Sequence, residues 1–213
     1  FRPHAQDHIA SEPVFHDQQT KDILRPFVKL RYRMLPYNYT LAYQNSSTGM
    51  PLMRPLFFSD ENNPALIDNA QSYFWGDAFL VTPVTAPGVT SMPVAVPKGV
   101  WFDYWNGARI TGGRTVTVPV TLQTIPVLVK AGSFIPMAAD DMPKTAAYDS
   151  GKLQLHYYAD STVKSASGMM YDDDGKDPNA LRDGHFEKLD FSASQNGKRL
   201  DIGLHRVGDF PGE

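Results

Sequence analysis

Residues 114–123 read RTVTVPVTLQ, and this stretch decides the fold of the chain. Apolar and polar residues alternate along it, which puts four apolar side chains on one face of an extended strand: Val116, Val118, Val120 and Leu122. Pro119 points to the opposite face and has no backbone N–H to donate, which favours an edge strand or a bulge. The stretch therefore predicts antiparallel β-structure with one buried face.

Short apolar runs of the same kind continue on both sides of this strand. They are separated by proline and glycine, with turns about every 8–12 residues, a spacing typical of a β-sandwich or Greek key. We expect the strands at 52–58, 79–84, 92–96, 101–104, 116–122, 125–129 and 134–137.

A second β unit is expected after residue 138, beyond a linker at 138–150. KLQLHYYA (152–159) alternates, as do the residues on either side of Asn196 and Gly197. An Asn-Gly pair between two alternating runs predicts a tight hairpin in which both of its residues take positive φ.

One long amphipathic helix is expected before the β units. Six apolar positions recur from it in steps of three and four: Ile23, Phe27, Leu30, Met34, Tyr37 (or Asn38) and Leu41. Asp17 is the expected N-cap and Gly49 the expected stop. Pro36 should kink the helix, whereas Pro26 lies nearer its start and is better tolerated. We expect loop at 1–20 and a short helix at 64–70.

The composition excludes several classes of protein. The chain has 213 residues, 42% hydrophobic and 20% charged, as in an ordinary globular protein. A net charge of -3 without basic clusters gives no reason to bind nucleic acid or an acidic membrane surface. No run approaches the ~20 apolar residues of a membrane-spanning helix. The absence of cysteine removes disulfides and thiolate chemistry.

Three groups of residues carry possible chemistry. His4, His8, Glu12 and His16 are spaced like zinc ligands on a helix, but Pro3 and Pro13 favour a loop with unrelated histidines. The acidic turn at 171–179 (YDDDGKDPN), which includes Asp172–Asp174, fails the EF-hand register. We favour a solvated turn over a calcium site there. Trp101, Tyr104 and Trp105 are typical of a core, with a sugar-stacking platform as the alternative.

The whole chain resembles the C-terminal third of glycoside hydrolase family 31, the α-glucosidase and α-xylosidase family. The matching segments follow the family's order: FRPH (1–4), SEPVF (11–15), LRYRMLPYNYTLAY (30–43), GMPLMRPLFF (49–58), FWGDAFLVTPV (74–84), PKGVWFDYWNG (97–107), IPVLVKAGSFIP (125–136) and YDDDG (171–175). No segment decides the matter alone, but their order and spacing together are specific.

The resemblance implies a mainly β chain: the last loop and helix of a (β/α)8 barrel at 1–49, a proximal antiparallel β-sandwich at 50–137 and a distal, incomplete β domain at 138–213. The family's two catalytic aspartates would lie upstream of Phe1, in a retaining enzyme. His4 matches the histidine that binds the sugar, and Arg2 would support it. The implied partners are an oligosaccharide or α-glycoside and the upstream barrel of the same protein, with no cofactor.

Two other hypotheses remain open. A non-catalytic carbohydrate-binding β-sandwich would depend on Trp101 or Trp105. A purely structural role, in which the β domains buttress the barrel, predicts apolar surface on the helix at Ile23, Phe27 and Leu30. The sequence alone identifies neither the sugar nor the compartment, which in a bacterium would be periplasmic, extracellular (for a secreted protein) or cytoplasmic.

Overall fold

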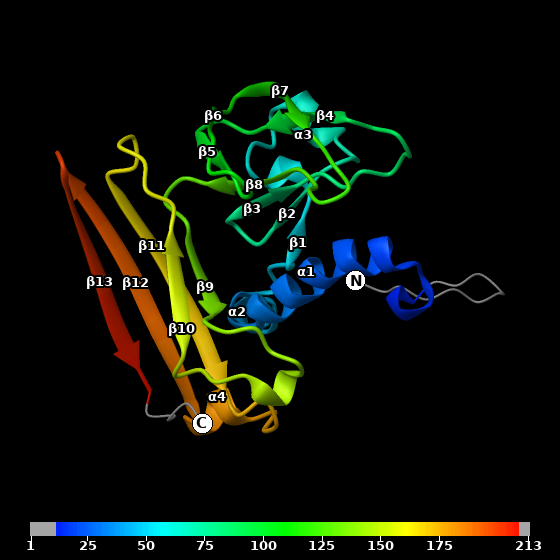
Figure 1. Ribbon diagram of the computed structural model, residues 1–213. Coiled ribbons are helices and arrows are strands. Elements are labelled where there is room, and N and C mark those ends of the chain that lie inside the picture. Colours follow the sequence, from blue (N-terminus) through cyan, green and yellow to red (C-terminus); the bar gives the residue numbers. More distant parts are fainter. Residues whose placement is uncertain (1–11, 209–213) are drawn as a thin grey trace.

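The computed structural model describes residues 12–208, in which two consecutive helices hold together two groups of β-strands (Figure 1). The first helix, α1 (Gln18–Arg33), and the second, α2 (Leu35–Thr48), follow one another with a break at Met34. Pro36 lies in the first turn of α2, so the predicted kink is confirmed as a break two residues before the proline. Pro26 lies inside α1 without ending it.

Both predicted ends of the helical segment are confirmed. The Asp17 carboxylate accepts the backbone N–H of Thr20 at 2.8 Å and so caps α1. Gly49 ends α2 in the left-handed conformation, with φ of 76°, and donates its N–H to the carbonyl of Asn45. The loop expected at 1–20 is too long at its C-terminal end, because α1 already begins at Gln18.

The first β unit is built from two antiparallel sheets. Its larger sheet has the order β1 (Met53–Arg54), β2 (Tyr73–Trp75), β3 (Phe79–Val81), β8 (Val127–Lys130), β5 (Val100–Asp103) and β6 (Arg109–Thr111). The smaller sheet pairs β4 (Ser91–Val96) with β7 (Arg114–Pro119). Within residues 12–208, β7 pairs with β4 alone, so the predicted edge strand is confirmed, although it begins two residues and ends three residues earlier than expected.

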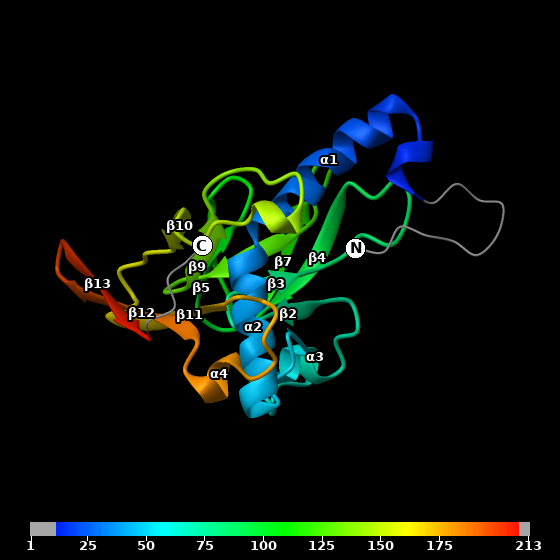
Figure 2. The same cartoon turned by 90° about the horizontal axis from the view of Figure 1, so that it is seen from below.

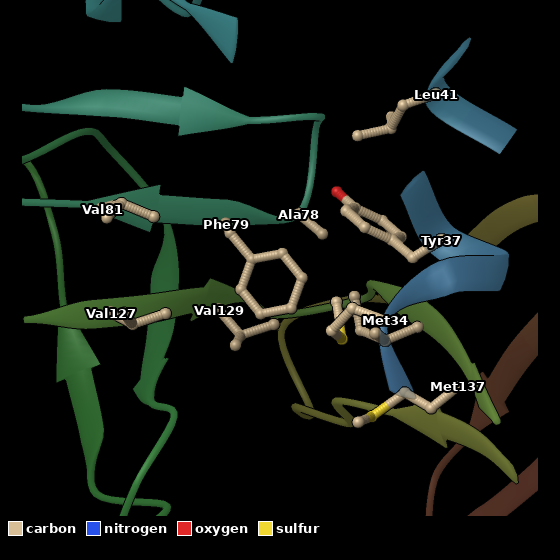
Figure 3. Packing of buried hydrophobic residues seen from close by; sticks show 10 residues of the cluster. Met34, Tyr37, Leu41, Ala78, Phe79, Val81, Val127, Val129 and Met137 are labelled. Atoms are coloured by element: carbon tan, nitrogen blue, oxygen red, sulfur yellow. The ribbon is translucent and has the colours of Figure 1, made fainter. Parts of the chain in front are cut away.

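The central strands β3 and β8 of the larger sheet are buried on both faces, which explains their continuous apolar sequences. Leu80 and Leu128 face β4 and β7, together with Trp101. The residues next to Leu80 and Leu128 on β3 and β8 face α2 instead. Together with residues of the helical segment and of β9 (Phe134–Ala138) they form a second core cluster, drawn in Figure 3: Met34, Tyr37, Leu41, Ala78, Phe79, Val81, Val127, Val129, Ile135 and Met137. The helix periodicity is therefore confirmed from Met34 to Leu41.

The second β unit is also antiparallel. β9 (Phe134–Ala138) pairs with β10 (Leu153–Tyr157), and β11 (Ser165–Asp173), β12 (Phe186–Asn196) and β13 (Arg199–Val207) form a three-stranded sheet. A small core joins the two sheets: Phe134, Met170, Phe191 and Ala193. The mainly β, antiparallel fold class is confirmed, whereas the domain boundaries at 49 and 137 stay predictions.

The hairpin after β12 is confirmed, but its turn differs from the prediction. Asn196 still pairs with Arg199, so the two central residues are Gly197 and Lys198. Of these two, only Gly197 has a positive φ, of 61°. A glycine with positive φ at the first central position is the requirement of a type II′ turn, not of the type I′ turn that Asn-Gly suggested.

Short elements account for most of the remaining differences. The strand expected at 52–58 is wrong beyond Arg54, because Pro55 begins the 3-10 turn η2 (Leu56–Phe58). The short helix is confirmed as α3 (Pro64–Ile67), whereas β2, β6 and the nine-residue β11 were not predicted. The other short elements are η1 (Pro13–Phe15), η3 (Thr145–Ala147) and α4 (Ala180–Asp183). None of the helices formed by the described part of the chain has the length and apolar content needed to cross a membrane.

Candidate functional site

The predicted substrate-binding residues, Arg2 and His4, lie outside the residues that the structure describes. The structure does describe the two helices, α1 and α2, that follow these residues along the chain. α1 has no fully buried residue, whereas α2 has four, and the N-terminal turns of α1 extend beyond the sheets (Figure 2). α2 is therefore the anchored part of the helical segment and α1 its open part.

A cleft of about 700 Å³ lies between α1 and the loop after β5. Ile23, Phe27 and Leu30 line it from the helix, and all three are partly exposed. Trp105 lies opposite, with its ring edge-to-face with Phe27 at a centroid distance of 5.7 Å. The apolar surface expected on this face of the helix is therefore present.

The aromatic residues of the first β unit are mainly structural. Trp101 is 2% exposed, stacks on Phe74 and donates its indole N–H to the Pro97 carbonyl at 3.0 Å. Trp105 is partly buried and donates its indole N–H to the Ile125 carbonyl at 2.6 Å. Because Trp101 presents no face to solvent, the platform that combined both tryptophans does not form.

The acidic stretch at 171–179 begins within β11, where Tyr171 and Asp172 are buried, so its first residues are not the solvated turn expected; they fasten the second β unit to α2. The Asp173 carboxylate accepts the hydroxyl of Tyr39 from α2 and, at 2.8 Å, that of Tyr171. Burial, together with the hydrogen bond to Asp173, raises the pKa of both tyrosines far above the usual value. The next carboxylate, Asp174, accepts the backbone N–H groups of Lys176 and Asp177 at 2.9 Å each.

The same stretch contains a buried carboxyl group that has no cationic partner at hydrogen-bonding distance among residues 12–208. Asp172 is 6% exposed and lies directly opposite Glu187 in the β11–β12 register. Burial raises the pKa of Asp172 to about 6, although a hydrogen bond from the Ser150 side chain acts in the opposite direction and lowers this pKa. A perturbed carboxyl group can mark an active site, but this one faces a strand neighbour and a linker rather than one of the clefts.

Metal binding gains no geometric support from this part of the chain. Glu12 and His16 do not share a continuous helix, because η1 lies between them and α1 begins only at Gln18. Among residues 12–208, no group of three or more histidine or acidic side chains is placed to hold a metal ion. His4 and His8 lie outside that range.

Sequence reasoning did not find the aromatic contacts that join the two β units. Tyr39 and Tyr43, one helical turn apart on α2, both approach Tyr171 on β11. The signal was present as an i, i+4 tyrosine pair, but its partner lies more than 120 residues further along the chain. A long-range contact of this kind is not visible in local patterning.

Comparison with known proteins follows the same division of the chain. The glycosyl hydrolases family 31 TIM-barrel domain matches residues 1–41, and the glycosyl hydrolase family 31 C-terminal domain matches residues 49–135. The chain is 33% identical over 165 residues to an α-xylosidase of Saccharolobus solfataricus, a match covering 77% of this chain and 22% of that protein. It is 34% identical over 184 residues to α-glucosidase 2 of Bacillus thermoamyloliquefaciens, a match that covers 83% of this chain and 23% of that protein.

Solved structures agree with these matches. A glycoside hydrolase family 31 dextranase of Flavobacterium johnsoniae superposes with a TM-score of 0.83 and 29% identity, covering 92% of this chain and 24% of that one. The family 31 α-xylosidase of Xanthomonas citri superposes with a TM-score of 0.82 and 28% identity, and the match covers 93% of this chain and 21% of that one. The helices and the first β unit thus correspond to part of the family's TIM-barrel domain and to its C-terminal domain. The chain belongs to glycoside hydrolase family 31, and it spans under a quarter of the length of these relatives.

Proposed function

We propose that this chain is the C-terminal part of a retaining α-glycosidase that hydrolyses terminal α-linked sugars, with an α-glucoside or α-xyloside as substrate. The observation that carries the proposal is the match of both family domains, in family order, to residues 1–41 and 49–135. Relatives named α-xylosidase and α-glucosidase support the two substrate classes.

In this proposal the catalytic aspartate pair lies upstream of Phe1 and the described residues hold the barrel's last helix in place. The packing of α2 against both β units supports that role, because α2 contributes Tyr37 and Leu41 to one core, next to Met34 at the helix break, and Tyr43 to a contact with β11. The apolar cleft along α1 would contact the remainder of the barrel.

His4 would touch the substrate and Arg2 would support it. A neutral imidazole can donate a hydrogen bond to a sugar hydroxyl from one nitrogen while the other nitrogen is held by a neighbour. Because the loops after barrel strands carry the active site, a residue just before α1 is well placed for this contact.

The test is hydrolysis of nitrophenyl α-glucoside, α-xyloside and α-galactoside by the longer polypeptide that contains this chain, with the anomer of the first product read by NMR. Turnover of the α-glucoside or α-xyloside with retention is expected. His4→Ala should lower kcat/KM by about 100-fold with an unchanged melting temperature, whereas His16→Ala, on the same segment, should leave kcat/KM unchanged. Inversion, or full activity of His4→Ala, would contradict the proposal.

A further inference from the structure

A second hollow lies beside α2 and shares no lining residue with the α1 cleft. This groove has a volume of about 410 Å³ and is bounded by α2, the β2–β3 turn, the β8–β9 turn and β11. Its volume falls within the ~300–1,000 Å³ of small-molecule sites. The polar side chains along its walls decide what it can hold.

The wall from α2 carries Tyr37, Thr40 and Gln44, whose spacing puts them on one face of the helix. The Tyr37 hydroxyl donates to the Trp75 carbonyl at 2.7 Å. Thr40 donates its hydroxyl to the Pro36 carbonyl at 2.8 Å and accepts the backbone N–H of Tyr171 at 3.1 Å. The Gln44 side-chain amide has no hydrogen-bond partner within residues 12–208, so both its donor and its acceptor are available to a ligand.

The wall from β11 carries Ser165 and Ser167. They alternate with Ala166, which packs against the inner core, and they share a strand face with Tyr171. Tyr171 stacks on Tyr43 of α2, so this is the face that looks toward the helix. Both serines are exposed, and neither hydroxyl has a partner in the described part of the chain.

The other end of the groove is formed by Asp77 and Lys130. The Asp77 side chain is 84% exposed although it pairs with the buried guanidinium of Arg54, which leaves a carboxylate oxygen free to accept. Lys130 is exposed and forms no ion pair with residues 12–208. The charges of Asp77 and Lys130 are opposite, so this end favours neither an anion nor a cation.

We propose that this groove binds a short, neutral, α-linked oligosaccharide. A sugar hydroxyl both donates and accepts, and the groove offers an amide, two hydroxyls, an ammonium and a carboxylate that together do both. An anion would meet Asp77, and an apolar ligand would leave these groups unpaired. The choice of an α-linked sugar rests on the proposed function; the groove as a binding site does not.

The test is saturation-transfer NMR on the 213-residue chain, with maltotriose and isomaltotriose as probes and inorganic phosphate as a competitor. We expect transfer to at least one trisaccharide and no displacement by phosphate. Gln44→Ala should weaken the apparent affinity about five-fold. Ser167→Phe, which fills the groove from an exposed strand position, should abolish the signal, whereas Ser91→Phe, at an exposed position on β4, should not.

Absence of transfer to both trisaccharides would overturn the proposal, as would a signal that survives in Ser167→Phe or that phosphate displaces. Circular dichroism of both phenylalanine variants separates lost binding from lost folding, and Gln44→Ala tests the same groove without adding bulk. The readout is binding, so a negative result here leaves the hydrolysis experiment untouched, and a failure of hydrolysis leaves this result standing.

Discussion

Tyr43 of α2 lies flat against Tyr171 of β11, with ring centroids 4.1 Å apart and an interplanar angle of 5°. The two residues are the centre of the contact between the helical segment and the second β unit. Tyr39 adds a hydroxyl bonded to Asp173, and Thr40 bonds the backbone N–H of Tyr171. Stacking, a charge-assisted hydrogen bond and a backbone bond therefore act at one place.

Removing the stacked ring should loosen this contact. Tyr43→Ala loses both the buried area and the ring pair, and we expect it to lower the free energy of unfolding by about 2 kcal/mol. Urea unfolding followed by circular dichroism measures the loss. Tyr32→Ala, on α1 and outside the ring contacts of the described residues, is the matched control and should cost less than half as much. Equal losses would contradict a special role for Tyr43.

The buried Asp172 should make stability depend on pH in the direction opposite to ordinary acid denaturation. Its pKa is raised to about 6 in the folded chain, above the ordinary 3.8 of the unfolded one, so the folded state binds the proton more tightly. The stabilisation is complete below about pH 4 and is lost as the pH rises through about 6. Screening by nearby water limits the effect to about 1–2 kcal/mol.

Asp172→Asn should therefore be more stable than the parent chain at pH 7.5 and should flatten this part of the profile. Urea unfolding at intervals from pH 4.5 to 7.5 gives the comparison. Asp68→Asn, at an exposed position, controls for the loss of one negative charge. If Asp172→Asn kept the parent's slope between pH 4.5 and 6.5, the buried carboxyl group would not be its source.

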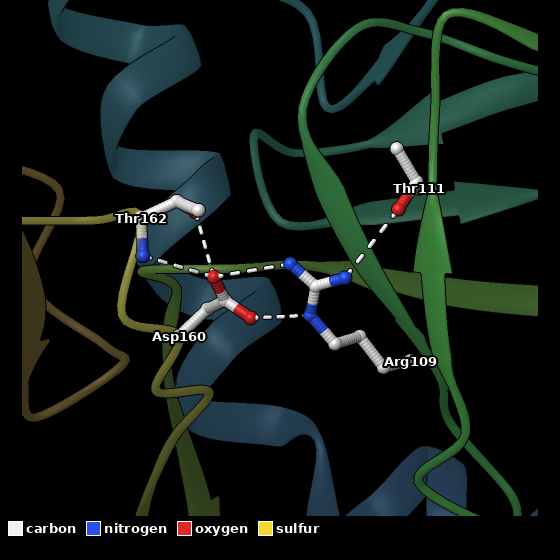
Figure 4. A network of polar contacts seen from close by, with 4 residues as sticks. All are labelled: Arg109, Thr111, Asp160 and Thr162. Carbon is white, nitrogen blue, oxygen red and sulfur yellow. Dashed lines mark hydrogen bonds and ion pairs between the residues drawn. The ribbon is translucent and has the colours of Figure 1, made fainter.

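Asp160 connects the loop before β11 to the first β unit (Figure 4). Its carboxylate accepts a hydrogen bond from Arg109 Nε at 2.7 Å. It also accepts hydrogen bonds from the backbone N–H of Thr162 at 3.0 Å and from the Thr162 hydroxyl at 2.7 Å. The hydrogen bond from Arg109 is the main reason why the pKa of Asp160 lies well below its usual range. The carboxylate is thus shared between two segments more than 50 residues apart.

Loss of that carboxylate should free the loop without unfolding the chain. In Asp160→Ala, amide hydrogen exchange in residues 160–163 should rise about ten-fold, because the loop loses both its cross-link and its internal turn. Arg109→Ala removes the cross-link alone and should produce a smaller rise confined to the same residues. Unchanged exchange in Asp160→Ala would show that the backbone holds the loop unaided.

The α1 cleft should behave as an uncovered contact surface. We expect the 213-residue chain to bind an apolar fluorescent dye, and Ile23→Ser with Phe27→Ser to reduce the fluorescence about threefold by making the cleft polar. Leu122→Ser removes a side chain that is 72% exposed but lies outside the cleft, and should change little. A fluorescence loss in Leu122→Ser equal to that of the double variant would place the dye elsewhere.

Local patterning predicted the elements whose signals are local. The Asp17 cap, the Gly49 stop, the break near Pro36 and the edge position of the strand that contains Pro119 each follow from the chemistry of one residue. β2 and β6 were missed because strands of three residues hold too few positions to show alternation. The nine-residue β11 was missed because its sequence, SASGMMYDD, does not keep an alternation of apolar and polar residues.

The candidate sites were harder to predict because they depend on contacts between distant segments. The groove beside α2 joins Gln44 to Ser167, and no spacing rule relates two residues so far apart. Trp101 shows the converse: its residue type suggested sugar stacking, but its burial could be known only from the sheet around it. His4 and Arg2 were proposed by family resemblance and stay predictions.

The most direct test of the central claim is whether the purified 213-residue chain hydrolyses nitrophenyl α-glucoside, α-xyloside or α-galactoside. We expect no turnover above the buffer rate, because the proposed catalytic aspartate pair lies upstream of Phe1. A parallel His4→Ala preparation controls for contaminating glycosidase, which would give the same rate in both. Turnover that persists through purification and falls in His4→Ala would contradict the account, since a working carboxylate pair would then lie within these residues.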